Sequence, residues 1–172
     1  MKSVLVSFGA AIVLAASLLA SEAGPVQGKV VISGRSFDLR YAWVVRGPDH
    51  FEPSRTRTYI VMSADDVSDE IRKCPDVTCA IFGVLKDGLI LENDDAGFWI
   101  RAVNPAFAKE KQMSGPTHDD TGWTATVNQA DRIAGHLRWV PQGVDPPILD
   151  FTVDATLLKE YPAPAGPTPR AR

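Results

Sequence analysis

Hydrophobic and polar residues alternate with a period of two in the two clearest segments of this chain. From Phe37 to Val45 every odd-numbered position is apolar or aromatic, and the even-numbered positions begin with Asp38 and Arg40. The segment from Leu149 to Leu157 alternates in the same way. Because successive side chains of a strand point to opposite faces of a sheet, each segment is predicted to be a strand with one buried face.

Shorter apolar runs, separated by turn residues, predict further strands and bring the expected total to about nine. These strands are 29–32, 56–63, 79–85, 89–92, 97–103, 123–128 and 132–140. The sequence Lys86-Asp87-Gly88 is the strongest hairpin signal, because Asp-Gly between two apolar runs suits a tight turn between antiparallel strands. A second hairpin is expected around Gly34, which can adopt the positive φ that such turns need.

Two short segments have helical features. Ser63 can cap a helix that continues to Lys73, with acidic residues in its first turn and basic residues in its last. Val67 and Ile71, one turn apart, give this helix a narrow apolar stripe that can lie on a sheet. The second candidate begins at Asn104-Pro105 and runs to Met113, since proline is favoured at the first helical position.

These elements predict an all-β fold with one or two short helices. Strands joined by hairpins and short loops, without a repeating strand-helix-strand pattern, favour a mainly antiparallel sheet that forms a sandwich or is barrel-like. The alternative is an α+β fold, in which the helix over 63–73 packs across the sheet.

Length and composition fit a single folded domain. The chain has 172 residues, of which 45% are hydrophobic and 23% are charged, and these values exclude a wholly disordered protein. The net charge of -3 provides no strong field that would favour nucleic acid or an anionic membrane. We expect one β-rich domain over 24–160, followed by a proline-rich disordered tail over 161–172.

The first 23 residues have the pattern of a secretory signal peptide. A short cationic start precedes an apolar stretch that ends at Ala20, and the small residues Ser21 and Ala23 precede the expected cleavage site. The segment 1–23 is therefore predicted to be removed on export to the periplasm or the medium, leaving no stable membrane span. The alternative is an uncleaved membrane anchor.

Cys74 and Cys79 are predicted to form a disulfide, because the compartments reached by exported proteins are oxidising. Their spacing is C-x4-C rather than the C-x-x-C of thioredoxin-like sites, and no second cysteine pair or nearby histidine completes a zinc site. The alternative is a pair of free or metal-binding thiols.

Three strand-like segments carry a resemblance to other proteins. These segments are GKVVISGRSFDLRYAW at 28–43, YIVMS at 59–63 and RIAGHL at 132–137. They resemble a group of exported β-rich bacterial proteins to which no activity has been assigned. The resemblance implies export and a β fold, and it implies no activity.

The sequence motifs of the common enzyme classes are missing. The chain has no G-x-S-x-G, H-E-x-x-H, P-loop, G-x-G-x-x-G or EF-hand loop. Their absence weakens an enzymatic interpretation without excluding it, so enzymatic activity stays an open question at this point.

The best candidate for metal or acid–base chemistry is the cluster of His118, Asp119 and Asp120. An imidazole beside carboxylates can bind a divalent cation or act as an oriented general base. His50 lies in a second loop rich in proline and acidic residues. If the two loops met at one end of the sheet, His50 and the His118 cluster would form an open metal site. The alternative is that both loops are simply solvated.

Trp99 and Arg101 are candidate ligand-binding residues. They share one face of the predicted strand 97–103, while Phe98 and Ile100 occupy the opposite face. An aromatic side chain on a sheet can stack on a sugar or another ligand. Core packing is the alternative, and it is favoured for the other three tryptophans.

Other polar residues are expected at the surface. Arg55 and Arg57 are interpreted as solvated charges near a strand edge. His136 lies on the face of its predicted strand opposite Leu137, which favours exposure to solvent. The acidic run that begins at Glu92 is interpreted as a turn, although its oxygens would also suit calcium.

The sequence therefore predicts an exported β-rich module that binds an unidentified protein or small molecule, or that is associated with the cell envelope. No cofactor and no nucleic acid partner are expected. The alternative is a small secreted or periplasmic hydrolase with a metal or His/Asp site built from the loops that carry His50 and His118.

Overall fold

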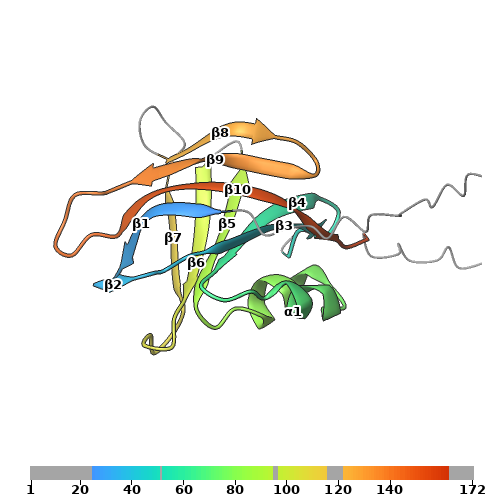
Figure 1. The fold of residues 1–172 in the computed structure, drawn as a ribbon, viewed down its shortest axis with the longest axis horizontal. Helices are drawn as coiled ribbons and strands as arrows, with labels where there is room; N and C mark the ends of the chain where they lie inside the picture. The colour runs from blue at the N-terminus through green and yellow to red at the C-terminus, as the bar shows by residue number, and fades with distance from the viewer. Residues whose placement is uncertain (1–24, 51, 95–96, 116–121, 163–172) are drawn as a thin grey trace, which may run out of the picture.

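The computed structural model describes residues 25–50, 52–94, 97–115 and 122–162. These residues form ten strands and two short helices, and the strands belong to one sheet that is curled into a half-barrel (Figure 1). The predicted all-β class, with a mainly antiparallel sheet and one or two short helices, is confirmed.

Most of the predicted strands are present, with shifted ends. The strands are β1 (Val26–Ile32), β2 (Arg35–Ser36), β3 (Tyr41–Pro48), β4 (Thr56–Ser63), β5 (Gly88–Asp94), β6 (Gly97–Val103), β7 (Lys111–Gly115), β8 (Gly122–Asn128), β9 (Arg132–Trp139) and β10 (Ile148–Glu160). The α-helix is α1 (Ser68–Lys73), and the π-helix is η1 (Cys79–Gly83).

Hydrogen bonds order the strands as β2-β1-β10-β3-β4-β5-β6-β7, and β9 and β8 continue the sheet from the other edge of β10. Neighbouring strands are antiparallel except for β10 and β3, which are parallel. β10 can serve several neighbours because it has 13 residues: its first half pairs with β1 and β9, and its last residues pair with β3. The sheet curls far enough for β6 to contact β8.

The concave face of the sheet encloses the larger hydrophobic cluster, which we call the inner core. It includes Val44 from β3, Ile60 from β4, Leu91 from β5, Leu137 from β9 and Phe151 from β10, each buried. Full burial of one such side chain stabilises the fold by about 1.5–3 kcal/mol. The inner core therefore holds the two ends of the curled sheet together.

A second hydrophobic cluster lies on the convex face of β3, β4 and β5, and we call it the outer layer. It joins Trp43 and Val61 of the sheet to Ile71 of α1 and Ile81 of η1. Both helices lie beside this face in Figure 1, outside the half-barrel. The central strands are therefore covered on both faces.

The prediction of one buried face for 37–45 is wrong for this reason. Trp43 and Val45 pack in the outer layer, whereas Ala42 and Val44 pack in the inner core, and all four side chains are fully buried. A strand that is buried on both faces is apolar at consecutive positions, as β3 is from Tyr41 to Val45.

The predicted strand over 79–85 is also wrong, because residues 79–83 form η1. The backbone N–H of Cys79 donates to the carboxylate of Asp76 at 2.8 Å, which starts the helical turn. Lys86-Asp87-Gly88 consequently connects a helix to β5 and is not a hairpin turn. Glycine is required at position 88, since a Cβ there would lie 2.2 Å from the carbonyl oxygen of Met62.

The predicted helix from Asn104 to Met113 is replaced by a turn and an edge strand, β7. The side-chain oxygen of Asn104 accepts a hydrogen bond from the N–H of Ala106, and its backbone carbonyl accepts one from the N–H of Phe107. These bonds close a turn, after which the chain runs back along β6. Asn104 therefore starts a turn instead of a helix, a role that asparagine side chains favour.

Helix α1 is shorter than predicted. Ser63 ends β4, and its hydroxyl accepts a hydrogen bond from the N–H of Asp65 instead of capping a helix. The helix begins at Ser68, whose N–H donates to the carboxylate of Asp66 at 2.9 Å. Because Ser63 is held in the sheet, the acidic residues between it and the helix form a connecting turn.

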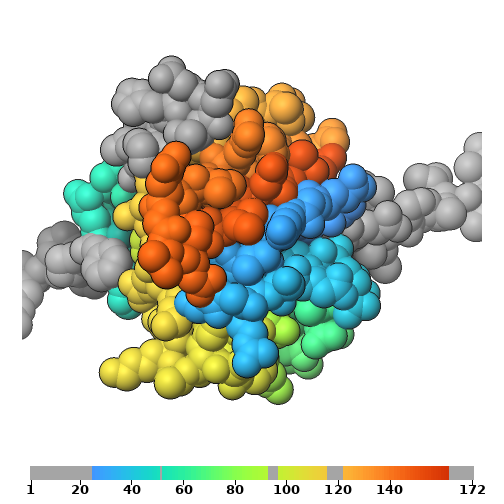
Figure 2. All heavy atoms as spheres, turned by 90° about the vertical axis from the view of Figure 1, so that its left-hand side faces the viewer, coloured from blue at the N-terminus to red at the C-terminus, as the bar shows by residue number. Residues whose placement is uncertain are grey.

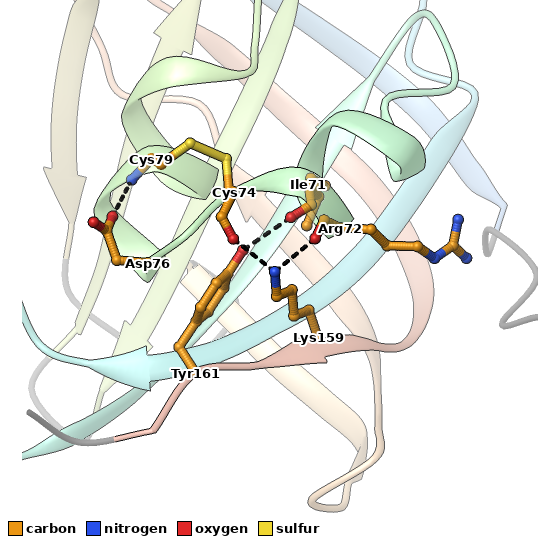
Figure 3. The surroundings of a disulfide bond; sticks show 7 residues. All are labelled: Ile71, Arg72, Cys74, Asp76, Cys79, Lys159 and Tyr161. Atoms are coloured by element: carbon orange, nitrogen blue, oxygen red, sulfur yellow. Dashed lines mark hydrogen bonds between the residues drawn. A yellow bond between two sulfur atoms is a disulfide. The ribbon is translucent and has the colours of Figure 1, made fainter.

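Cys74 and Cys79 form a disulfide, as predicted (Figure 3). The bond links the end of α1 to the start of η1. Both helices of the outer layer are thus joined covalently within six residues of sequence.

The end of β10 holds the C-terminal end of α1. Lys159 donates hydrogen bonds to the carbonyls of Arg72 and Cys74, both at 2.6 Å, and the Tyr161 hydroxyl donates to the carbonyl of Ile71 at 2.9 Å (Figure 3). The carbonyls at the end of a helix lack helical N–H partners, and here the Ile71 carbonyl accepts the backbone N–H of Cys74 as well as the Tyr161 hydroxyl. A lysine beside this end also complements the negative end of the helix dipole. The hydrogen bonds that hold the end of α1 therefore come from residues far from it in the sequence.

Tyr161 belongs to the folded domain, although the predicted disordered tail begins there. Its side chain is 5% exposed, and burial followed by the negative charge of Asp76 raises its pKa to about 12. The rest of the predicted tail from residue 163, and the predicted signal peptide, lie outside the described residues. No helix in the described ranges is long and apolar enough to cross a membrane.

Figure 2 shows the face of the molecule that lies on the left of Figure 1, away from α1. It is formed by the β1–β2 hairpin, the connection between β9 and β10, and the connection between β6 and β7. Val144, in the β9–β10 connection, is fully exposed.

Candidate functional site

A pocket of about 240 Å³ opens beside the outer layer, where η1 meets the ends of the central strands. We call it the acidic-aromatic pocket after the side chains that line it. They are Asp49, His50 and Glu52 from the β3–β4 loop, Arg57 and Tyr59 from β4, Ile81 and Phe82 from η1, Glu92 from β5 and Trp99 from β6. Residues from five separate segments therefore form one site.

A largely buried charge network forms one wall of the pocket. The Arg57 guanidinium donates from Nε to the carboxylate of Asp49, and its Nη1 lies 2.8 Å from Oε1 of Glu92. The exposed fractions of the three side chains are 16%, 6% and 20%, in that order. Charges this far removed from water need partners, and the planar guanidinium provides donors for both carboxylates.

The position of Asp49 is set by the loop that it begins. One oxygen of its carboxylate accepts the backbone N–H of Glu52 at 2.9 Å, and its own N–H donates to the carbonyl of Arg55 at 2.8 Å. The loop thus folds back on itself and turns the Asp49 carboxylate towards β4. Arg57, interpreted above as a solvated charge, is instead partly buried and paired, so that part of the prediction is wrong.

Aromatic rings form the opposite side of the pocket. Trp99 is half-buried on the convex face of β6, and Phe82 comes from η1. The His50 ring lies edge-on to Phe82 with 5.1 Å between ring centroids, and its Nδ1 lies 3.4 Å from the Thr78 hydroxyl. His50 and Glu52 are exposed at the rim, whereas Tyr59 and Ile81 are buried at the floor.

Tyr59, at the floor of the pocket, has a raised pKa. Its side chain is 2% exposed, and burial raises the pKa of its hydroxyl far above the ordinary value of 10.0. The carboxylates of Glu92 and Asp49 raise this pKa further, more than Arg57 lowers it. The hydroxyl therefore stays protonated, first because a buried phenolate would lose its hydration and then because two carboxylates lie nearby.

Arg101 shares a face with Trp99 as predicted, but it does not line the pocket. It is 6% exposed and donates to the carbonyls of Ile81 at 2.7 Å and Phe82 at 3.4 Å. Its Nε donates to Glu110 at 2.7 Å, and the guanidinium lies over the Phe82 ring, 4.9 Å from the centroid. Arg101 thus fixes η1 on the sheet and positions the Phe82 wall from behind.

The predicted metal site can be followed only in part. His50 lies at the pocket rim, whereas His118, Asp119 and Asp120 fall outside the described residues. Within the ranges that the structure describes, no three His, Cys, Asp or Glu side chains are grouped closely enough to hold a metal ion. His136 is half-exposed on β9, with its Nε2 2.8 Å from Asp150 of β10.

A second pocket of about 330 Å³ adjoins the first and shares Asp49 and His50 with it. Its other lining residues are Pro48, Pro53, Pro75, Asp76, Val77, Thr78, Tyr161 and Pro162. The β3–β4 loop therefore separates two hollows, one acidic and aromatic and the other largely formed by proline and tyrosine.

Sequence reasoning missed most of the pocket. The sequence pattern places Asp49 in a loop, Arg57 at a solvated strand edge and Phe82 in a strand. One signal was present: Arg57 alternates with Tyr59 and Val61, both of which are buried on the same face of β4. A charged residue in phase with buried neighbours indicates a buried ion pair. Its partners could not be identified, because they come from other segments.

A search of protein-family models, of curated proteins and of solved structures found no match to this chain. The resemblance to exported β-rich bacterial proteins therefore stays a prediction. The functional argument rests on the site itself.

Proposed function

We propose that this chain is an exported β-rich module that binds a small-molecule ligand in the acidic-aromatic pocket. The observation that carries the proposal is the pocket itself, a hollow of about 240 Å³ with aromatic side chains on one side and a paired charge network on the other. Ligand sites in proteins typically combine apolar or aromatic walls with a few fixed polar groups. Catalysis is not needed to explain this combination.

The walls of the pocket are held in place before any ligand arrives. Arg101 fixes η1 from behind, and the disulfide fixes the start of η1. Asp49 is held by the backbone of its own loop and by Arg57. A site whose walls are already ordered loses little conformational entropy on binding, which favours affinity.

Export is proposed from residues 1–23, and the Cys74–Cys79 disulfide supports it, since such bonds persist in oxidising compartments. N-terminal sequencing of protein recovered from an exporting host should begin at Gly24. Recovery of the native protein with Met1 to Ala23 intact would contradict export by signal cleavage.

Binding is tested by thermal denaturation in the presence of small organic cations, neutral polyols and organic anions. A ligand that binds only the folded state raises Tm by mass action. We expect at least one class to raise the Tm of the wild-type protein and to have a smaller effect on Trp99→Leu, compared with each protein's own ligand-free Tm. If no class raises the Tm, or if both proteins respond equally to every class, the acidic-aromatic pocket is not the binding site.

A further inference from the structure

Three strands within the described ranges pair with a single neighbour: β2, β7 and β8. An edge strand presents backbone N–H and C=O groups along its outer side, and proteins protect such edges by short length, charge, proline or bulges. β2 has two residues, including Arg35, and β7 has five, beginning at Lys111. Both of these edges are therefore short and carry a charged residue.

β8 is less protected than the other two edges. It has seven residues, none of them charged and none of them proline, and it is the outermost strand at the top of Figure 1. Gly122 and Trp123 are buried at the end where the sheet curls towards β6. Thr124, Ala125 and Thr126 are exposed. The exposed part of β8 is thus an uncharged edge that contains threonine, a residue that favours extended chain.

The charged side chains nearest this edge are paired on its far side. Arg132 of β9 donates to the carboxylate of Asp154 at 2.6 and 2.8 Å, and Nε2 of His136 lies 2.8 Å from Asp150. These pairs join β9 to β10, whereas β8 lies on the opposite side of β9. A second copy of this edge can therefore approach β8 without strong like-charge repulsion, and the net charge of -3 per chain is small.

We propose that the exposed edge of β8 is a self-association surface, on which β8 of a second copy pairs in the antiparallel direction about a two-fold axis. Such a contact uses the same patch on both copies and closes on itself. With the axis near Ala125, Thr124 of one copy lies close to Thr126 of the other, and threonine pairs across strands stabilise sheets. This inference goes beyond the proposed function, because the acidic-aromatic pocket takes no part in the contact.

A β-bulge limits how strongly the two copies can pair. The register of β8 against β9 shifts between Ala125 and Val127, so that Thr126 is the extra residue. A bulge increases the local twist and interrupts regular pairing. Because only a short stretch of backbone is left to pair on each side of it, the contact is small. We therefore expect a dissociation constant of about 10 µM to 1 mM.

The test is sedimentation equilibrium of the protein recovered from an exporting host, over concentrations from about 10 µM to about 1 mM. The average molar mass should rise from that of one chain towards that of two, without larger species, because a two-fold contact closes on itself. Hydrogen exchange at the two ends of this range locates the contact. Exchange should become slower in β8 at high concentration and stay unchanged in β7.

Charged variants tie the association to β8. In Thr124→Lys/Thr126→Lys, like charges face each other across the axis, so the dissociation constant should rise by about tenfold or more. The matched control is Gln112→Lys/Ser114→Lys, which adds the same charges at exposed positions of the β7 edge and should leave association unchanged. Far-UV circular dichroism and Tm, compared with wild type, show that each variant is folded.

A charge swap gives the sharpest result. Thr124→Glu/Thr126→Glu should also dissociate when it is alone, for the same reason as the lysine variant. An equimolar mixture of the lysine and glutamate variants should form dimers again, because opposite charges then face each other across the axis.

Three outcomes would overturn the proposal. The first is the mass of a single chain at every concentration, whether or not a strand of another protein pairs with β8. The second is a dimer that the lysine variant leaves intact or that the β7 control weakens equally, because the contact would then lie elsewhere. The third is a mixture of the lysine and glutamate variants that stays monomeric.

Discussion

The inner core and the outer layer pack against opposite faces of the same strands, yet they are held together in different ways. The inner core is formed by apolar side chains from strands whose backbones already pair with one another. The outer layer adds two helices of six and five residues to the sheet. Those helices are tied down by a disulfide and by hydrogen bonds from Arg101, Lys159 and Tyr161.

The difference follows from helix length. Isolated helices shorter than about 12–15 residues are marginal in water, because nucleation costs more than a few hydrogen bonds return. Their last carbonyls also lack partners inside the helix. In this protein the donors come from β6 and from the end of β10, so the outer layer depends on specific polar contacts as well as on burial.

The acidic-aromatic pocket uses both regions. Its charge network includes Arg57 of β4 and Glu92 of β5, two strands that also contribute to the inner core. Its Phe82 side chain belongs to η1 in the outer layer. Changes to the inner core should therefore unfold the whole domain, whereas changes to the outer layer should loosen the pocket first. Three measurements test this distinction, in order of decreasing expected effect.

The largest effect is expected from Phe151→Ala in the inner core. Phe151 is 1% exposed on β10, the strand that joins β1, β9 and β3. Loss of a buried phenylalanine should lower the free energy of unfolding by about 3–5 kcal/mol. Urea denaturation followed by far-UV circular dichroism measures this change.

Val144→Ala is the matched control, because Val144 is fully exposed in the β9–β10 connection. It should change the free energy of unfolding by less than about 0.5 kcal/mol. A loss below about 1 kcal/mol for Phe151→Ala would show that the inner core is not the main source of stability.

A smaller effect is expected from the double variant Cys74→Ala/Cys79→Ala. The disulfide closes a short loop, so its removal should lower the free energy of unfolding by about 2 kcal/mol. Because the bond links α1 to η1, hydrogen exchange should become faster in these helices and change little in β9 and β10. Equal acceleration in all four elements would contradict a separate outer layer.

The smallest effect concerns Glu110, the partner of Arg101 at the back of η1. The hydrogen bond from Arg101 lowers the pKa of Glu110 below its ordinary value of 4.5. A carboxylate whose pKa is lower in the folded chain stabilises the fold above pH 4.5, and this contribution is lost as the pH falls through the folded-state pKa. When the pH is lowered from about 6 to about 3, Glu110→Gln should therefore lose less stability than the wild-type protein.

The measurement is Tm as a function of pH for wild type, Glu110→Gln and Glu70→Gln. Glu70 is an exposed carboxylate of α1 and serves as the control. Identical pH profiles for wild type and Glu110→Gln would show that the Arg101–Glu110 pair does not contribute to holding the outer layer.

The amphipathic strands illustrate what could be predicted. The alternation over 149–157 predicted β10 because its odd-numbered apolar residues face the inner core. The disulfide was predictable because the two cysteines are close in sequence and export to an oxidising compartment was expected. The helix predicted at Asn104 and the strand predicted at Cys79 are wrong, because local hydrogen bonds that Asn104 and Asp76 accept from backbone N–H groups set turns that propensity alone does not reveal.

The β-rich class, the approximate positions of most strands and the disulfide could be predicted from local patterns, because side-chain alternation and the nearness of two cysteines are visible in short segments. The covering of the central strands on both faces became visible only in the folded chain, as did the pocket shared by Asp49, Arg57, Phe82, Glu92 and Trp99. A paired charge removed from water depends on partners from separate segments of the chain, here the β3–β4 loop, β4 and β5. Their meeting is fixed by sheet order and curvature, which no local pattern records.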